Sequence, residues 1–161
     1  MSQKEKELQQ KVNMLNMAVM NWCRWASLVL RYTLDTYGEE ALEGLKEKFK
    51  ESGRKVGPLT QRALRIEEQD ATAMARIVDM GDEAVGIQGE WTELSAGKAV
   101  KIEKVCPIAR GLREAPEFCG ELIPAFMEGE LEGMGIPFRT VIAKNLAKGD
   151  SVCEIIIEPK E

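Results

Sequence analysis

The spacing of apolar residues changes near Ala84, and this change limits the folds open to the chain. Before it, apolar side chains recur every three or four residues, as in an α-helix; after it, segments such as 85–91 and 100–103 alternate apolar and polar residues, as in a β-strand. We therefore predict a helical half over residues 1–82 and a sheet-containing half over residues 83–161. A chain of 161 residues has the size of one compact domain.

The first predicted helix, residues 4–35, carries two rows of apolar side chains. One row contains Leu8, Val12, Leu15, Val19, Trp22, Ala26 and Val29, and the other contains Met14, Met17, Trp25, Leu28 and Tyr32. Because the two rows leave most of the girth apolar, we expect the helix to be central or to pack against a partner subunit as well as its own domain. A symmetric pairing would hide the surplus apolar surface, so we predict a homodimer with this helix at its interface.

Turn and capping residues divide the rest of the chain. In the helical half, helices are predicted to end at Tyr37-Gly38, Gly53 and Gly81, and new ones to begin after Gly57-Pro58 and Asp70. In the other half, a hairpin that turns at 95–97 is followed by a helix over 115–132 and by a second hairpin of strands 138–144 and 152–158. This order predicts an α+β fold, in which helices cover a four-stranded, mostly antiparallel sheet.

Charge and composition exclude several classes of function. With 22 basic and 27 acidic residues the net charge is −5, and no basic stripe is present, so we expect no nucleic-acid partner. The absence of histidine excludes Ser-His-Asp and Cys-His catalysis and every imidazole metal site. Arg24 interrupts the apolar stretch 14–30, and the N-terminus lacks the pattern of a secretory signal, so we expect a cytoplasmic protein without a membrane span.

Three of the four cysteines lie in the last third of the chain, at Cys106, Cys119 and Cys153. Cys106 has the parity of Val100 and Ile102, Cys153 shares the apolar face of its strand, and Cys119 shares the apolar face of its helix, so all three are predicted to point inward near one end of the sheet. Buried cysteines are commonly plain packing residues. The alternatives are a reactive thiolate, which favours Cys119 in a first helical turn, or thiolate ligation of zinc or an iron–sulfur cluster by the three together. The lack of a CxxC pair weakens the metal alternative, and a cytoplasmic location disfavours a disulfide.

Polar candidates are predicted near the same place. A bidentate arginine can hold a substrate carboxylate, and the candidates for this role are Arg110, Arg113 and Arg139. Glu117 and Glu121, near the start of the predicted helix, are candidate general bases. Arginine and glutamate within one helical turn also commonly form solvated ion pairs that serve only solubility.

Three segments carry a resemblance to a known family. They are the Cys106-Pro107 element after the first hairpin, the segment PEFCGEL around Cys119 and the terminal hairpin LAKGDSVCEIIIE. Together with the helical first half, they resemble the family named for L-2-amino-thiazoline-4-carboxylic acid hydrolase. The order of elements is also similar to that of the 4-vinyl-reductase-type small-molecule-binding domains.

The resemblance to the hydrolase family implies hydrolytic opening of a small cyclic amidine. Water would attack the amidine carbon, activated by Glu117 or Glu121 or by a metal on the cysteines, while an arginine held the substrate carboxylate. The alternative is a non-catalytic domain that binds a small molecule, zinc or an iron–sulfur cluster through Cys106, Cys119 and Cys153. Sequence alone leaves both functions open.

Overall fold

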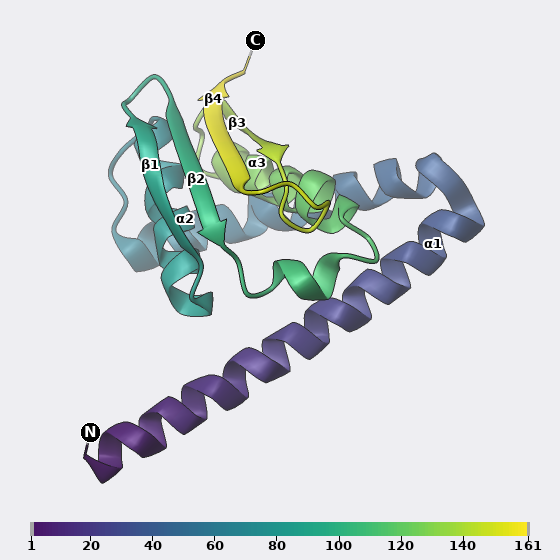
Figure 1. Ribbon diagram of the computed structural model, residues 1–161. Coiled ribbons are helices and arrows are strands. Elements are labelled where there is room, and N and C mark those ends of the chain that lie inside the picture. Colours follow the sequence, from purple (N-terminus) through teal and green to yellow (C-terminus); the bar gives the residue numbers. More distant parts are fainter. Residues whose placement is uncertain (1, 161) are drawn as a thin grey trace.

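The computed structural model describes residues 2–160 and confirms the α+β fold class (Figure 1). The elements in chain order are α1 (Gln3–Leu64), α2 (Ala71–Val85), β1 (Gln88–Leu94), β2 (Ala99–Val105), the 3-10 turn η1 (Ala109–Leu112), the π-helical turn η2 (Phe118–Leu122), α3 (Ile123–Gly133), β3 (Phe138–Lys144) and β4 (Cys153–Pro159). All neighbouring strands are antiparallel, in the order β1-β2-β4-β3. Helices α2 and α3 lie on the same side of this sheet (Figure 1). No helix within residues 2–160 has the length and apolarity needed to cross a membrane.

Helix α1 bends once, at Gly38, and then continues to Leu64. The predicted boundary at Gly38 is confirmed, because this glycine adopts φ 70°, a left-handed conformation that side chains disfavour. The predicted end at Gly53 and the predicted new start after Gly57-Pro58 are wrong, because both glycines lie inside the helix.

The glycines of α1 serve close packing against α3. A Cβ atom at Gly53 would collide with the main-chain oxygen of Phe126, and one at Gly57 with that of Glu130. On the other helix, a Cβ atom at Gly129 would meet the main-chain oxygen of Lys50, and one at Gly133 that of Arg54. The two backbones therefore touch along one GxxxG face from each helix. The local sequence of neither segment predicts this contact.

Helix α2 begins as predicted, with the Asp70 carboxylate accepting a hydrogen bond from Thr72 N–H at 2.9 Å. The predicted end at Gly81 is wrong, since the helix runs to Val85 and ends at Gly86 with φ 78°. Val85 therefore belongs to the helix, and β1 starts only at Gln88.

The inward face of β2 is opposite to the predicted one. Ala99, Lys101 and Glu103 are buried, whereas Val100 and Ile102 are only half buried on the other face. The prediction took Val100 and Ile102 as the buried side of β2. Because alternate residues of a strand face opposite sides, this choice turned the wrong side of the strand inward. Two charged side chains are thereby buried between the sheet and α2.

Candidate functional site

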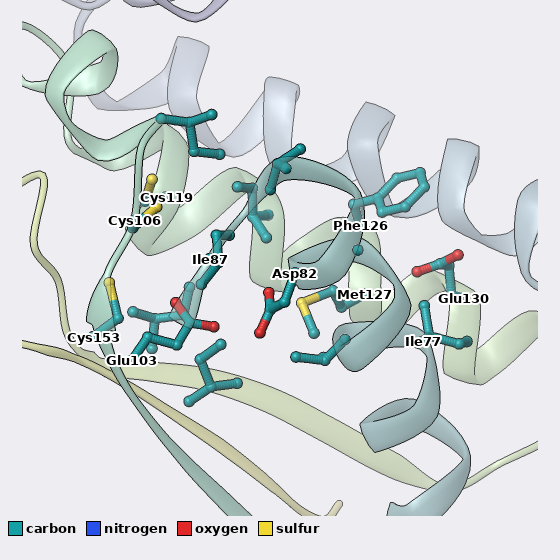
Figure 2. Close-up of a pocket in the computed structure, with 17 residues that line it drawn as sticks. Ile77, Asp82, Ile87, Glu103, Cys106, Cys119, Phe126, Met127, Glu130 and Cys153 are labelled. Atoms are coloured by element: carbon teal, nitrogen blue, oxygen red, sulfur yellow. The ribbon is translucent and has the colours of Figure 1, made fainter. Parts of the chain in front are cut away.

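A cavity of about 280 Å³ lies between α2, α3 and the inner face of the sheet (Figure 2). Its walls are mostly apolar, with side chains that include Ile77, Val85, Phe126, Met127, Ile142 and Ile155. Cys106 and Ile108, between β2 and η1, and Cys119 of η2 complete the wall. The cavity thus occupies the position that a continuous core would fill in a fully packed domain.

The three cysteines singled out from the sequence all line this cavity. Cys106 and Cys119 lie near each other, and Cys153 lies closer to the sheet (Figure 2). All four cysteines of the chain are free thiols. Within residues 2–160, no group of three or more Cys, Asp or Glu side chains is arranged to hold a metal ion. The zinc and iron–sulfur alternatives therefore have no ready ligand set in the described part of the chain.

Burial keeps the cavity thiols protonated. It raises the pKa of Cys106 to about 11 and that of Cys119 to about 12, and it also raises the pKa of Cys153. The Leu146 N–H donates a hydrogen bond to Cys153 Sγ at 3.3 Å, which only partly offsets this burial. Because the thiolate is the nucleophilic form, this environment favours packing and weak hydrogen bonding over nucleophilic attack.

A charged cluster on one wall was missed by the sequence analysis. Lys101 Nζ lies 2.5 Å from Asp82 Oδ2 and 2.5 Å from Asp79 Oδ1, and its side chain is almost fully buried. Asp82 in turn is hydrogen-bonded to Glu103, which is 3% exposed (Figure 2). Burial raises the pKa of Glu103 to about 7, and the negative charge of the nearby Asp82 is the second cause of this increase. The two carboxyls therefore lie close together beside a buried ammonium group, and their proximity disfavours ionisation of both.

A second carboxyl, Glu130 of α3, lines the cavity from its other wall (Figure 2). Burial raises its pKa to about 7, and the Thr60 hydroxyl donates a long hydrogen bond to it at 3.5 Å. Glu130 follows Gly129 at the close contact between α1 and α3, which carries its side chain below the surface. No sequence signal distinguished this glutamate from Glu128 and Glu132, whose half-buried side chains form ion pairs.

The other predicted site residues lie elsewhere. Glu117 pairs with Arg31 at 3.3 Å and Glu121 with Lys46 at 3.3 Å, both on the outer side of η2. Arg139 pairs with Glu158 at 2.7 Å across β3 and β4. Arg110 and Arg113 line a separate surface depression between η1 and α1. The predicted meeting of arginines, glutamates and cysteines at one site is therefore not formed, since only the cysteines reach the cavity.

Comparison with known proteins gives a fold likeness. No protein-family model and no curated protein matches the chain. Among solved structures, the phenol-responsive sensory domain of the transcription activator PoxR with phenol matches with a TM-score of 0.62 at 13% identity, over 85% of this chain and 74% of that one. A trafficking protein particle complex subunit 3 from Naegleria fowleri, covalently bound to palmitic acid, matches with a TM-score of 0.54 at 16% identity, over 95% and 97%.

Because their sequence identity to this chain is only 13% and 16%, these two structures show a likeness of fold alone. The predicted likeness to small-molecule-binding domains agrees with the sensory-domain match, whereas the predicted likeness to the hydrolase family has no counterpart among the comparisons.

Proposed function

We propose that this protein binds a small apolar molecule in the cavity between α2, α3 and the sheet. The observation that carries the proposal is the cavity itself, about 280 Å³ of mostly apolar space at the centre of the domain. An engineered apolar cavity of about 150 Å³ holds a benzene molecule, so this one has room for a substituted aromatic ring or a short hydrocarbon. The match to a sensory domain solved with phenol supports a ligand of this kind.

The polar groups of the cavity narrow the chemistry of the ligand. Glu103, Asp82 and Glu130 line it, and the nearest cation, Lys101, is already held by Asp79 and Asp82. A neutral ligand with a hydroxyl or amine hydrogen suits such acceptors, while a carboxylate would meet like charges in a desolvated site. We therefore expect an aromatic alcohol to bind and a fatty acid to be rejected.

Three ring compounds of similar size test this proposal: 4-methylphenol, 4-methylanisole and 4-methylbenzoate. Calorimetry and thermal shift should show the phenol binding most tightly, the anisole about tenfold more weakly, and the benzoate not at all. The variant Ile155→Phe should fill the cavity and abolish binding. Its matched control is Ile156→Phe, which alters the opposite face of β4 and should bind normally. Failure of every compound to bind the wild type, or equal binding to both variants, would contradict the proposal.

The hydrolase suggested by the sequence resemblance remains a second candidate, favoured by one observation. A carboxyl with a pKa of about 7, as at Glu103, is suited to general acid–base catalysis near neutral pH. The base would then be Glu103 in place of Glu117 or Glu121, whose side chains face away from the cavity. Turnover of 2-aminothiazoline-4-carboxylate by the wild type, lost in Glu103→Gln, would support this candidate; no turnover by the wild type would reject it.

A further inference from the structure

The N-terminal half of α1 presents an exposed apolar row, of which Trp25 also borders a depression shared with Phe49 and Phe118. The row contains Met14, Met17, Trp25, Leu28 and Tyr32, whose side chains are between 48% and 67% exposed. The opposite side of the same turns contacts the body, where Ser27 Oγ accepts a hydrogen bond from Ala115 N–H and Leu30 packs in an apolar cluster. The row is therefore apolar surface that the chain itself leaves in contact with water.

The beginning of α1 also projects beyond the body of the domain (Figure 1). Residues 2–15 are exposed on every side of the helix, including Leu8 and Leu15. An isolated helix of this length is marginally stable in water, because little apolar surface is buried to offset the cost of ordering it. A second element packed along the helix would supply that burial.

The row repeats along a straight helix. Met14 and Trp25, Met17 and Leu28, and Asn21 and Tyr32 are each eleven residues apart. Eleven residues make three turns at about 3.67 residues per turn, close to the 3.6 of a straight α-helix. The row thus stays on one side from residue 14 to residue 32, before the bend at Gly38, and a second straight helix can follow it throughout.

The row is also complementary to itself when reversed. If an identical helix runs antiparallel about a two-fold axis near residue 23, Met14 lies level with the partner's Tyr32 and Met17 with the partner's Leu28. Asn21 then lies level with the partner's Trp25, whose indole N–H can donate to the asparagine oxygen. Methionine sulfur against an aromatic ring is a favourable contact. Each end of the row therefore meets a suitable side chain at the other end of the same row.

We infer that a second copy of this chain docks on the row, with the two α1 helices packed antiparallel around residue 23. A stable interface removes about 800 Å² per partner from water, and aromatic side chains contribute the largest single shares of such an area, up to about 150–250 Å² each. More than half of the surface of Trp22, Trp25 and Tyr32 is exposed, and several aliphatic side chains flank them. This assembly also gives the predicted homodimer a defined interface.

Light scattering on the full chain tests the association. The wild type should have the mass of a dimer at micromolar concentration, and Met17→Glu and Leu28→Glu should have that of a monomer while keeping the helical signal in circular dichroism. Matched controls are Leu59→Glu and Met80→Glu, exposed apolar positions outside the row, which should remain dimeric. A monomeric wild type, or dimers in the Met17→Glu and Leu28→Glu variants, would overturn the inference. Binding of a monomeric wild type to lipid vesicles would overturn it too.

Cross-linking tests the direction of the helices. In the double variant Met17→Cys/Leu28→Cys, oxidation should give a disulfide-linked dimer, and peptide mapping should assign the link to position 17 of one chain and position 28 of the other. The single variants should form no such link, and the native cysteines serve as internal controls. A 17–17 or 28–28 link in place of 17–28 would indicate parallel helices and would reject the arrangement.

Discussion

Asp82 of α2 and Glu103 of β2 are hydrogen-bonded to each other on the wall of the cavity, although 21 positions separate them in the sequence. Lys101 binds Asp82 from the other side at 2.5 Å. The arrangement places two carboxyls and the ion pairs of Lys101 on one wall of a mostly apolar cavity. Because a buried polar network is stable only when every member has its partner, the network gives the cavity a fixed polar position against which a ligand can be oriented.

Glu130 is expected to make stability depend on pH. Its pKa is about 7 in the folded protein and near 4.5 in the unfolded chain, so the folded state binds more protons between these values. The stabilisation is fully present below pH 4.5 and is lost as the pH rises through 7. Glu130→Gln, which mimics the neutral acid, should be about 1–3 kcal/mol more stable than the wild type at pH 8 and equal to it near pH 4. Urea unfolding across this range measures the difference. The control is the exposed Glu121→Gln, which should show no such divergence from the wild type as the pH rises.

Removal of the buried ammonium group should be costly. Lys101→Met leaves Asp82 without its cation beside the apolar cavity, and the free energy of unfolding should fall by about 3–5 kcal/mol. The double variant Lys101→Met/Asp82→Asn should recover part of this loss, because the buried Asp82 carboxylate that has lost its cation is then replaced by a neutral amide. Lys104→Met removes an exposed pair with Glu90 and should cost less than about 1 kcal/mol. Equal losses in the two single variants would show that the buried cluster has no special role.

The GxxxG contact between α1 and α3 predicts opposite effects for two glycines of the same helix. Gly57→Ala forces the helices apart and should destabilise the protein by about 1–3 kcal/mol. Gly44→Ala faces open space and should stabilise it by about 0.5–1 kcal/mol through helix propensity. Chemical denaturation compares the two; a stabilising Gly57→Ala would mean that the helices do not touch there.

The raised thiol pKa values predict slow alkylation. At neutral pH only about one in ten thousand Cys106 side chains is a thiolate, given a pKa of about 11. Iodoacetamide should therefore label Cys106 and Cys119 far more slowly in the folded protein than in urea, as followed by mass spectrometry of peptides. Rapid labelling of Cys119 at pH 7 would restore the nucleophilic role predicted from its position in a first helical turn.

Local patterns of the sequence determined the fold class and many of its boundaries. The change of apolar period separated helices from strands, Asp70 identified the start of α2, and the turns at 95–97 and 147–150 identified both hairpins. These signals act within a few residues, because capping, turn conformation and side-chain alternation depend on the nearby backbone. The inward direction of Cys119 and Cys153 followed from the same patterns, whereas Cys106 was assigned by the wrong parity of β2 and reaches the cavity because the strand ends at Val105.

Tertiary structure decided which residues share a site. Gly53 was predicted to end a helix and Gly57 to precede a new one, yet both lie inside α1, where the backbone of α3 occupies the space that side chains would need. Lys101 and Glu103 have the signature of a solvent-facing strand side, yet both are buried, because Asp79 and Asp82 of α2 neutralise Lys101 and Asp82 also lies against Glu103. In both cases the deciding contact is with a segment distant in sequence. A local sequence pattern cannot predict such a contact, because the contact stabilises the fold only once the two distant segments have packed together.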